Sequence, residues 1–193
     1  EGEEHALHGA GREDIDARML GEGRPFVVEV RRPKRRHWDA EEMARRINEL
    51  AAGRIQVSDL RGSDKAEVVA LKDATWEKTY LISFNVEGDV TEEALRSATG
   101  TLSGSIIKQR TPQRVSHRRA DKERSRAVRQ LELVDLSEGL VTVKVRGESG
   151  IYVKELIHGD RGRTQPSMAE LLDTSCDVVE LDVLKVHDDD RGE

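Results

Sequence analysis

The stretch RQLELVDLSEGLVTVKVRGE, residues 129–148, decides the fold class of this chain. Two runs rich in leucine and valine flank the segment Ser137-Glu138-Gly139, whose serine and glycine favour a turn. A short turn between two apolar runs is typical of a β-hairpin, in which neighbouring strands are antiparallel. The centre of the chain therefore predicts an antiparallel sheet.

Further strands and helices are predicted on both sides of this hairpin. Apolar and β-branched runs predict strands at residues 24–30, 54–60, 65–73, 75–88, 104–109 and 176–186. Helices are predicted at 39–53 with Asp39 as the cap, at 92–100 after Thr91, at 151–159, and at 168–173 after Ser167. Because strands and helices are interleaved without regular β-α-β spacing, the sequence predicts an α+β fold with a largely antiparallel sheet.

The composition narrows the class of protein. A chain of 193 residues suits one large domain or two small lobes that share a core, and we take residues 1–193 as one domain. With 36% apolar and only 3% aromatic residues, its core must be aliphatic. No apolar run reaches the roughly 18–20 residues that span a membrane, and no signal-peptide pattern is visible. The single cysteine, Cys176, excludes an internal disulfide and is expected to be buried. We expect a cytoplasmic protein.

Positive charge is concentrated in two segments although the net charge is −6. Residues 31–36, RRPKRR, carry five positive charges, and residues 110–129 carry seven arginines and one lysine against two acids. Because phosphate binding depends on the local field, these segments are candidates for contact with a nucleic acid. The alternative is that both are solvated loops or helix faces.

The segment GAGREDIDARMLGEGRP, residues 9–25, places Arg12, Asp14, Asp16 and Arg18 at alternate positions. In an extended segment these four side chains point to one side. The flanking glycines argue against a long helix, in which Asp14 and Arg18 would form only an exposed pair. The pattern therefore predicts a loop that presents charge, and loops on a scaffold often carry sites.

Few residues suggest a particular chemistry. No glycine-rich phosphate loop and no Ser-His-Asp or Cys-His arrangement is present, and His5 and His8 lack neighbours to complete a metal shell. Asp14 beside Arg12, together with Tyr80 and Lys154, remains as a candidate set. A carboxylate near cations stays ionised, as a nucleophile requires. Because this set is not specific, a catalytic and a structural role both stay open.

Four segments, in order, carry a resemblance to one family. GRED, residues 11–14, resembles the Gly-Arg-X-Asp motif that carries the catalytic aspartate of tRNA pseudouridine synthases. The longer string AGREDIDARMLGEGRPF resembles the archaeal and eukaryotic family that modifies uridines 54 and 55 in the TΨC arm of tRNA. EKTYLISF, QRTPQRVSHRR and GIYVKELIHGDRGRTQPS agree with the same family, so the resemblance covers nearly the whole chain.

This resemblance implies a fold, a reaction and a partner. The fold would be that of pseudouridine synthases: two α+β halves around a central, mostly antiparallel sheet, with Asp14 at the floor of a basic active-site cleft. Asp14 would form a transient adduct while the glycosidic bond moves from N1 to C5 of the uracil. The implied partner is tRNA through its TΨC arm, with no cofactor, no metal and no membrane.

The resemblance also implies roles for individual residues. Arg12 would pair with Asp14 and hold the place of the flipped nucleotide, and Lys154 would also pair with Asp14. Tyr80 would stack on the target base and take the C5 proton, and Leu181 would form an apolar wall of the base pocket. Contacts to the RNA backbone are expected from Arg110, Arg114, Arg118, Arg119, Arg161 and Arg163.

Two departures from the family pattern and two alternatives accompany this prediction. Asp16 occupies a position that is commonly glycine in the wider superfamily, and we expect it to hold Arg18. Family members carry an additional N-terminal RNA-binding region, so the chain is expected to be the catalytic domain without that region. The alternatives are a non-catalytic module of the same fold that binds structured RNA, and a carboxylate hydrolase of N-glycosidic bonds.

Overall fold

The computed structural model describes residues 2–187, which form two compact units. The smaller unit comprises residues up to Gly11 together with Pro25–Ala74. The larger unit comprises Arg12–Arg24 together with the chain from Thr75 onward. The charged segment after Gly11 is thus part of the larger unit, although the residues on both sides of it belong to the smaller one.

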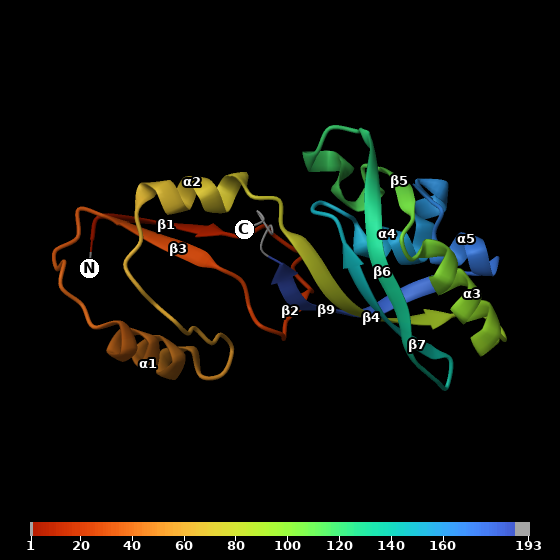
Figure 1. The fold of residues 1–193 in the computed structure, drawn as a ribbon, viewed down its shortest axis with the longest axis horizontal. Coiled ribbons are helices and arrows are strands. Elements are labelled where there is room, and N and C mark those ends of the chain that lie inside the picture. Colours follow the sequence, from red (N-terminus) through yellow and green to blue (C-terminus); the bar gives the residue numbers. More distant parts are fainter. Residues whose placement is uncertain (1, 188–193) are drawn as a thin grey trace. The chain divides into compact units, whose positions relative to one another are not determined.

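The smaller unit is a two-stranded antiparallel ribbon accompanied by two helices (Figure 1). Asp39 caps the first helix as predicted, because its carboxylate accepts a hydrogen bond of 2.8 Å from the backbone N–H of Glu42. The predicted strand at 24–30 and helix at 39–53 are therefore confirmed in type. The elements are β1 (Glu4–Gly9), β3 (Phe26–Arg31), α1 (Ala40–Ala51) and α2 (Lys65–Asp73).

Two strand predictions in this unit are wrong. Residues 65–73 form α2, since Asp64 accepts a hydrogen bond of 2.9 Å from the N–H of Glu67 and so caps a helix start. Residues 54–60 form no regular element, because the side-chain amide of Asn48 bonds both the N–H and the carbonyl of Val57. In each case a polar side chain satisfies backbone groups that a strand would have paired with a neighbour.

The larger unit is built on a seven-stranded sheet in the described part of the chain, with strand order β2-β9-β4-β7-β6-β5-β8. Neighbouring strands are antiparallel except β2 and β9, so the predicted α+β class with a mostly antiparallel sheet is confirmed. The strands are β2 (Arg18–Met19), β4 (Glu77–Val86), β5 (Ile106–Arg110), β6 (Glu123–Ser137), β7 (Leu140–Gly147), β8 (Thr164–Gln165) and β9 (Cys176–His187). The helices are α3 (Glu92–Leu102), η1 (Gln113–Arg118), α4 (Val153–His158), η2 (Gly159–Gly162) and α5 (Met168–Leu172).

The predicted hairpin is the long β6–β7 pair, which runs across this unit (Figure 1). Its turn consists of Glu138 and Gly139, with φ of 51° and 83°. Positive φ at both central residues is what a two-residue type I′ turn requires, and the glycine adopts it without steric cost. The prediction from residues 129–148 is confirmed in type and in turn position.

The core lies between one face of the sheet and the helices. Ile82 and Phe84 of β4 and Val143 of β7 are fully buried, and Leu95 of α3 and Leu156 of α4 belong to the same cluster. Each such side chain contributes about 1.5–3 kcal/mol by leaving water. Because side chains alternate along a strand, the intervening residues point to the opposite face of the sheet, which is polar.

The arginine-rich segment 110–129 is divided among several elements. It contributes the end of β5, the short helix η1, a loop, and the first half of β6, so its side chains point in different directions.

Among the described residues, no helix combines the length and the apolar character that crossing a membrane requires.

Candidate active site

Residues of the charged segment 12–24 form ion pairs with four other elements of the larger unit, and Glu13 also pairs with Arg24 within the segment. An Asp14-to-Ala17 turn, with a backbone hydrogen bond of 3.2 Å, bends the segment, so its alternate residues do not share one face as the sequence predicts. The pairs are Glu13 with Lys78 of β4 (2.5 Å) and with Arg24, Asp14 with Arg114 of η1 (2.5 Å), Asp16 with Lys154 of α4 (2.5 Å), and Arg18 with Asp182 of β9 (2.7 Å).

Glu13 forms the buried anchor of this segment. Its side chain is 8% exposed and that of Lys78 is 10% exposed, and Arg24 pairs with the same carboxylate. Burial, helped by the like charge of Arg24, lowers the pKa of Lys78 to about 8, and the contacting Glu13 carboxylate opposes this shift. Glu13 was not predicted as a site residue. Because it directly precedes Asp14, its ion pairs hold the backbone next to Asp14 in place.

A pocket of about 350 Å³ opens beside this segment. Its lining combines exposed arginines, here called the rim, with buried residues of β4, β9 and the start of α4. Asp14 lies in it with its side chain 23% exposed. The lining residues are Arg12, Glu13, Asp14, Tyr80, Arg114, Val115, Arg118, Arg119, Gly150, Ile151, Tyr152, Val153 and Leu181.

Arg114 connects Asp14 to the interior of the protein. Its Nη1 lies 2.5 Å from Oδ2 of Asp14, while its Nε and Nη2 donate hydrogen bonds of 2.6 Å and 3.2 Å to the two carboxylate oxygens of Glu155. Although burial by itself lowers the pKa of Arg114, the bonds to Glu155 and Asp14 raise it above its usual range. A permanently charged guanidinium therefore faces the Asp14 carboxylate across a contact of 2.5 Å.

Tyr80 and Leu181 belong to the apolar part of the pocket lining. They come from the adjacent strands β4 and β9, and both are buried. Burial raises the pKa of Tyr80 to about 12, with Arg24 opposing and Asp14 adding to the shift. The Tyr80 side chain is therefore a neutral phenol at physiological pH.

The raised pKa of Tyr80 predicts a specific pH dependence of stability. Its pKa is about 12 in the folded protein and 10.0 for an unperturbed tyrosine, so the unfolded chain loses this proton first as the pH rises. Between pH 10 and pH 12 the free energy of unfolding should therefore fall, and it should fall less steeply in Tyr80→Phe. Urea denaturation of both proteins below and within this window measures the difference. Equal slopes would contradict the burial of the hydroxyl.

Three predicted pairings are wrong. Asp14 pairs with Arg114 instead of Lys154, because Lys154 donates to Asp16. The bond to Lys154 lowers the pKa of Asp16 and fixes the far side of the turn. Arg12 lies at the pocket rim with an exposed side chain, so it is not the partner of Asp14 among the described residues. The expected Asp16–Arg18 pair is likewise replaced, since each finds a partner outside the segment.

The six arginines predicted to contact RNA divide into two groups. Arg114, Arg118 and Arg119 line the pocket. Arg110 and Arg163 lie outside it, and both pair with Asp121, at 2.5 Å and 2.9 Å. Arg161 is exposed on η2, also outside the pocket. The tertiary structure therefore concentrates three of these cations around Asp14.

Glu155 is a site residue that the sequence analysis missed. Its signal in the sequence is weak: it is an acid beside the apolar residues Val153, Leu156 and Ile157 of α4, all of which are buried. Among the described residues, no group of three or more histidine, cysteine or carboxylate side chains is arranged to hold a metal ion.

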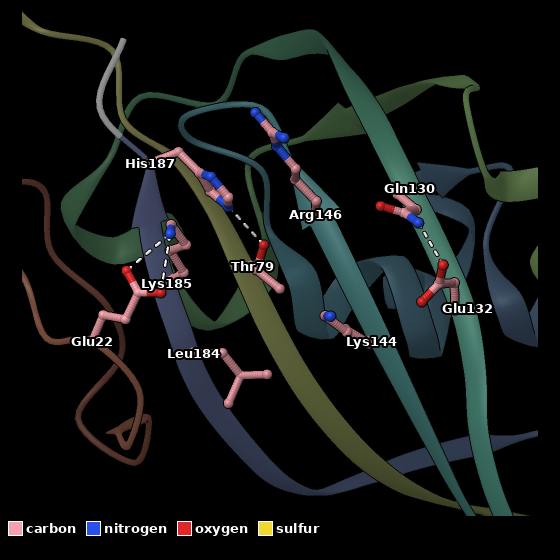
Figure 2. Close-up of a pocket in the computed structure, with 9 residues that line it drawn as sticks. All are labelled: Glu22, Thr79, Gln130, Glu132, Lys144, Arg146, Leu184, Lys185 and His187. Carbon is pink, nitrogen blue, oxygen red and sulfur yellow. Dashed lines mark hydrogen bonds and ion pairs between the residues drawn. The ribbon is translucent and has the colours of Figure 1, made fainter. Parts of the chain in front are cut away.

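A second depression, of about 300 Å³, lies on the polar face of the sheet (Figure 2). Figure 2 shows that Lys185 pairs with Glu22, at 2.9 Å, and that His187 bonds the Thr79 hydroxyl, at 2.8 Å. Arg146 pairs with Glu77, at 3.0 Å. Thr79 precedes Tyr80 on β4, so this depression and the Asp14 pocket lie on opposite faces of the sheet.

Comparison with known proteins gives a consistent family likeness. A family model described as "Pus10, C-terminal" matches residues 1–187. A tRNA pseudouridine synthase Pus10 from Methanothrix thermoacetophila is 55% identical over 186 residues, which are 95% of this chain and 40% of the relative. The corresponding protein of Halorubrum lacusprofundi is 43% identical over 193 residues, 99% of this chain and 45% of the relative. The chain thus spans less than half the length of these curated relatives.

A solved structure supports the fold. The crystal structure of a Cbf5-Nop10-Gar1 complex contains a chain that superposes with a TM-score of 0.51 and 24% identity, covering 62% of this chain and 33% of that chain. At this level the likeness concerns the fold alone, and it agrees with the mostly antiparallel sheet of the larger unit.

Proposed function

This chain belongs to the Pus10 C-terminal family, and on that premise we propose that its larger unit isomerises uridine to pseudouridine in tRNA. The observation that carries the proposal is the Asp14 carboxylate, which lies in a pocket of about 350 Å³ with Nη1 of Arg114 at 2.5 Å. A carboxylate that lies in a pocket and is held by a fixed cation suits the formation of a transient adduct with the substrate. The volume is sufficient for a flipped base.

The proposed reaction requires only rearrangement within one nucleotide. The bond between N1 of uracil and C1′ of the ribose breaks, a bond between C5 and C1′ forms, the C5 proton leaves and N1 gains a proton. Asp14 would hold the separated fragment while the base turns. Because Tyr80 is a neutral phenol with a pKa of about 12, we assign it stacking on the base and withdraw the expected role as acceptor of the C5 proton.

The rim of the pocket supports binding of structured RNA. Arg12, Arg118 and Arg119 are exposed at this rim. Arginines at such positions neutralise phosphates and supply energy for moving a base out of its stack. The proposed target is the TΨC arm at uridines 54 and 55, and a protein that acts on tRNA is expected in the cytoplasm.

Release of tritium from a tRNA transcript labelled at uridine C5 tests this function, using the natural protein at its full length. Isomerisation must expel the hydrogen from C5, so release that rises with time is expected. Appearance of free uracil on base chromatography would instead indicate an N-glycosidic hydrolase. No release from tRNA that is demonstrably bound would favour the non-catalytic binding module.

Removal of the rim arginines separates binding from chemistry. In the double variant Arg118→Ala, Arg119→Ala, affinity for tRNA should fall, and the slope of log K against log salt should decrease by about one for each phosphate that the variant no longer neutralises. Filter binding at several salt concentrations measures this slope. An unchanged slope would place the RNA-binding surface elsewhere on the protein.

A further inference from the structure

Glu155 is a buried carboxylate that the proposed reaction does not directly use. It lies in the first turn of α4 with its side chain 1% exposed, and it is surrounded in sequence by the buried Val153, Leu156 and Ile157. Burial of a charged carboxylate is unfavourable unless it is paired and hydrogen-bonded. The position of Glu155 therefore requires a specific partner.

That partner is Arg114, and the pairing uses one complete edge of the guanidinium. Nε donates to Oε1 of Glu155 at 2.6 Å and Nη2 donates to Oε2 at 3.2 Å, so two roughly parallel bonds join the groups. Each carboxylate oxygen of Glu155 thus accepts a hydrogen bond from the same side chain. Such a bidentate pair fixes the orientation of the guanidinium plane as well as its position.

The remaining terminal nitrogen of Arg114 is directed at Asp14. Nη1 lies 2.5 Å from Oδ2 of Asp14, and the Arg114 side chain is 34% exposed, so it would be free to turn toward solvent if its inner edge were released. The three groups form a line from the interior to the pocket: Glu155, Arg114, Asp14. The two outer members come from segments far apart in the chain, α4 and the loop after Gly11.

We propose that Glu155 is a positioning residue for the proposed isomerisation: it holds the Arg114 guanidinium so that Nη1 faces the Asp14 carboxylate. This inference rests on the proposed function in so far as Asp14 is the catalytic group. Glu155 itself contacts neither the pocket nor a substrate, since it is absent from the pocket lining. Its effect reaches the reacting atoms through Arg114.

The test is Glu155→Gln, which keeps the size of the side chain and removes its charge. Glu77→Gln is the matched control, because Glu77 is a partly buried acid that also binds arginines, Arg129 at 2.6 Å and Arg146 at 3.0 Å, away from the pocket. We expect kcat for tRNA modification to fall about 10- to 100-fold in Glu155→Gln, as for a misplaced catalytic group, with KM nearly unchanged. Glu77→Gln should leave both constants at the wild-type values. Thermal unfolding of all three proteins checks for a general loss of stability.

A second measurement does not depend on activity. In ¹⁵N NMR spectra, the guanidinium of wild-type Arg114 should rotate slowly and its Nε–H should exchange slowly with water. The reason is that Glu155 binds Nε and Nη2 while Asp14 binds Nη1. Glu155→Gln should speed up both processes, whereas Glu77→Gln should not. If no variant or wild type modifies tRNA but the Arg114 signals respond in this way, the proposed function fails and the positioning role stands. Unchanged Arg114 signals in Glu155→Gln, or equal losses of kcat in both variants, would overturn the inference.

Discussion

Asp14→Asn should lower the turnover of tRNA modification by about 10⁴-fold or more, the size of effect seen when a nucleophile or its essential carboxylate is removed. The substitution preserves the shape of the side chain, so the bond from Arg114 can persist as a hydrogen bond to a neutral amide while the nucleophilic charge is removed. Affinity for tRNA should stay near the wild-type value, because phosphate binding is assigned to other residues. Tritium release and filter binding, measured on the same preparation, give the two quantities.

Asp16→Asn is the matched control for this experiment. Asp16 lies two residues further along the same loop and pairs with Lys154 at 2.5 Å, but its side chain is exposed and lies outside the pocket lining. Most of the turnover should remain in this variant. If Asp16→Asn abolished turnover and Asp14→Asn did not, the catalytic carboxylate would be Asp16 and the assignment to Asp14 would be wrong. If Asp14→Asn reduced affinity and turnover equally, a chemical role for Asp14 would be excluded.

Glu13→Leu should destabilise the protein by about 3–5 kcal/mol, because it leaves the buried Lys78 ammonium without its carboxylate. Burial lowers the pKa of Lys78 to about 8, whereas an unperturbed lysine has a pKa of 10.5. Glu13→Leu removes the carboxylate that opposes this shift, so the folded variant sheds the Lys78 proton at no higher a pH, well before the unfolded chain does. The stability of the variant should therefore recover as the pH rises toward 10.5. Urea denaturation followed by circular dichroism at neutral and alkaline pH measures both effects.

Variants of Lys78 distinguish the ion pair from a general packing defect. Lys78→Met leaves Glu13 paired with Arg24, so it should cost less, about 1–3 kcal/mol. The double variant Glu13→Leu, Lys78→Met should be more stable than Glu13→Leu, since an apolar pair can replace a buried ion pair. If the double variant were as unstable as the sum of the single ones, the two side chains would not be energetically coupled.

Local sequence patterns identified most elements of the larger unit. The β6–β7 hairpin and its turn, the cap of α3 at Thr91, the cap of α5 at Ser167 and strand β9 all follow from signals within a few residues. The failures at 54–60 and 65–73 arose where a single polar side chain, Asn48 or Asp64, decided the backbone hydrogen bonding against the apolar pattern. Such a competition depends on the geometry of the side chain and leaves little trace in periodicity.

The sequence by itself determined the mixed α+β class and the hairpin at its centre. The resemblance of its motifs to a known family, and not the residue pattern alone, singled out Asp14 as the candidate catalytic residue. Only the tertiary structure decided the partners: Arg114 instead of Lys154 for Asp14, Lys154 for Asp16, and the buried Glu155 behind Arg114. The physical reason is that strand, helix and turn propensities act between near neighbours in the chain. An ion pair forms instead between groups that the fold brings together, and Asp16 and Lys154 are 138 positions apart. Which cation reaches which carboxylate is therefore set by the packing of η1 and α4 around the loop after Gly11.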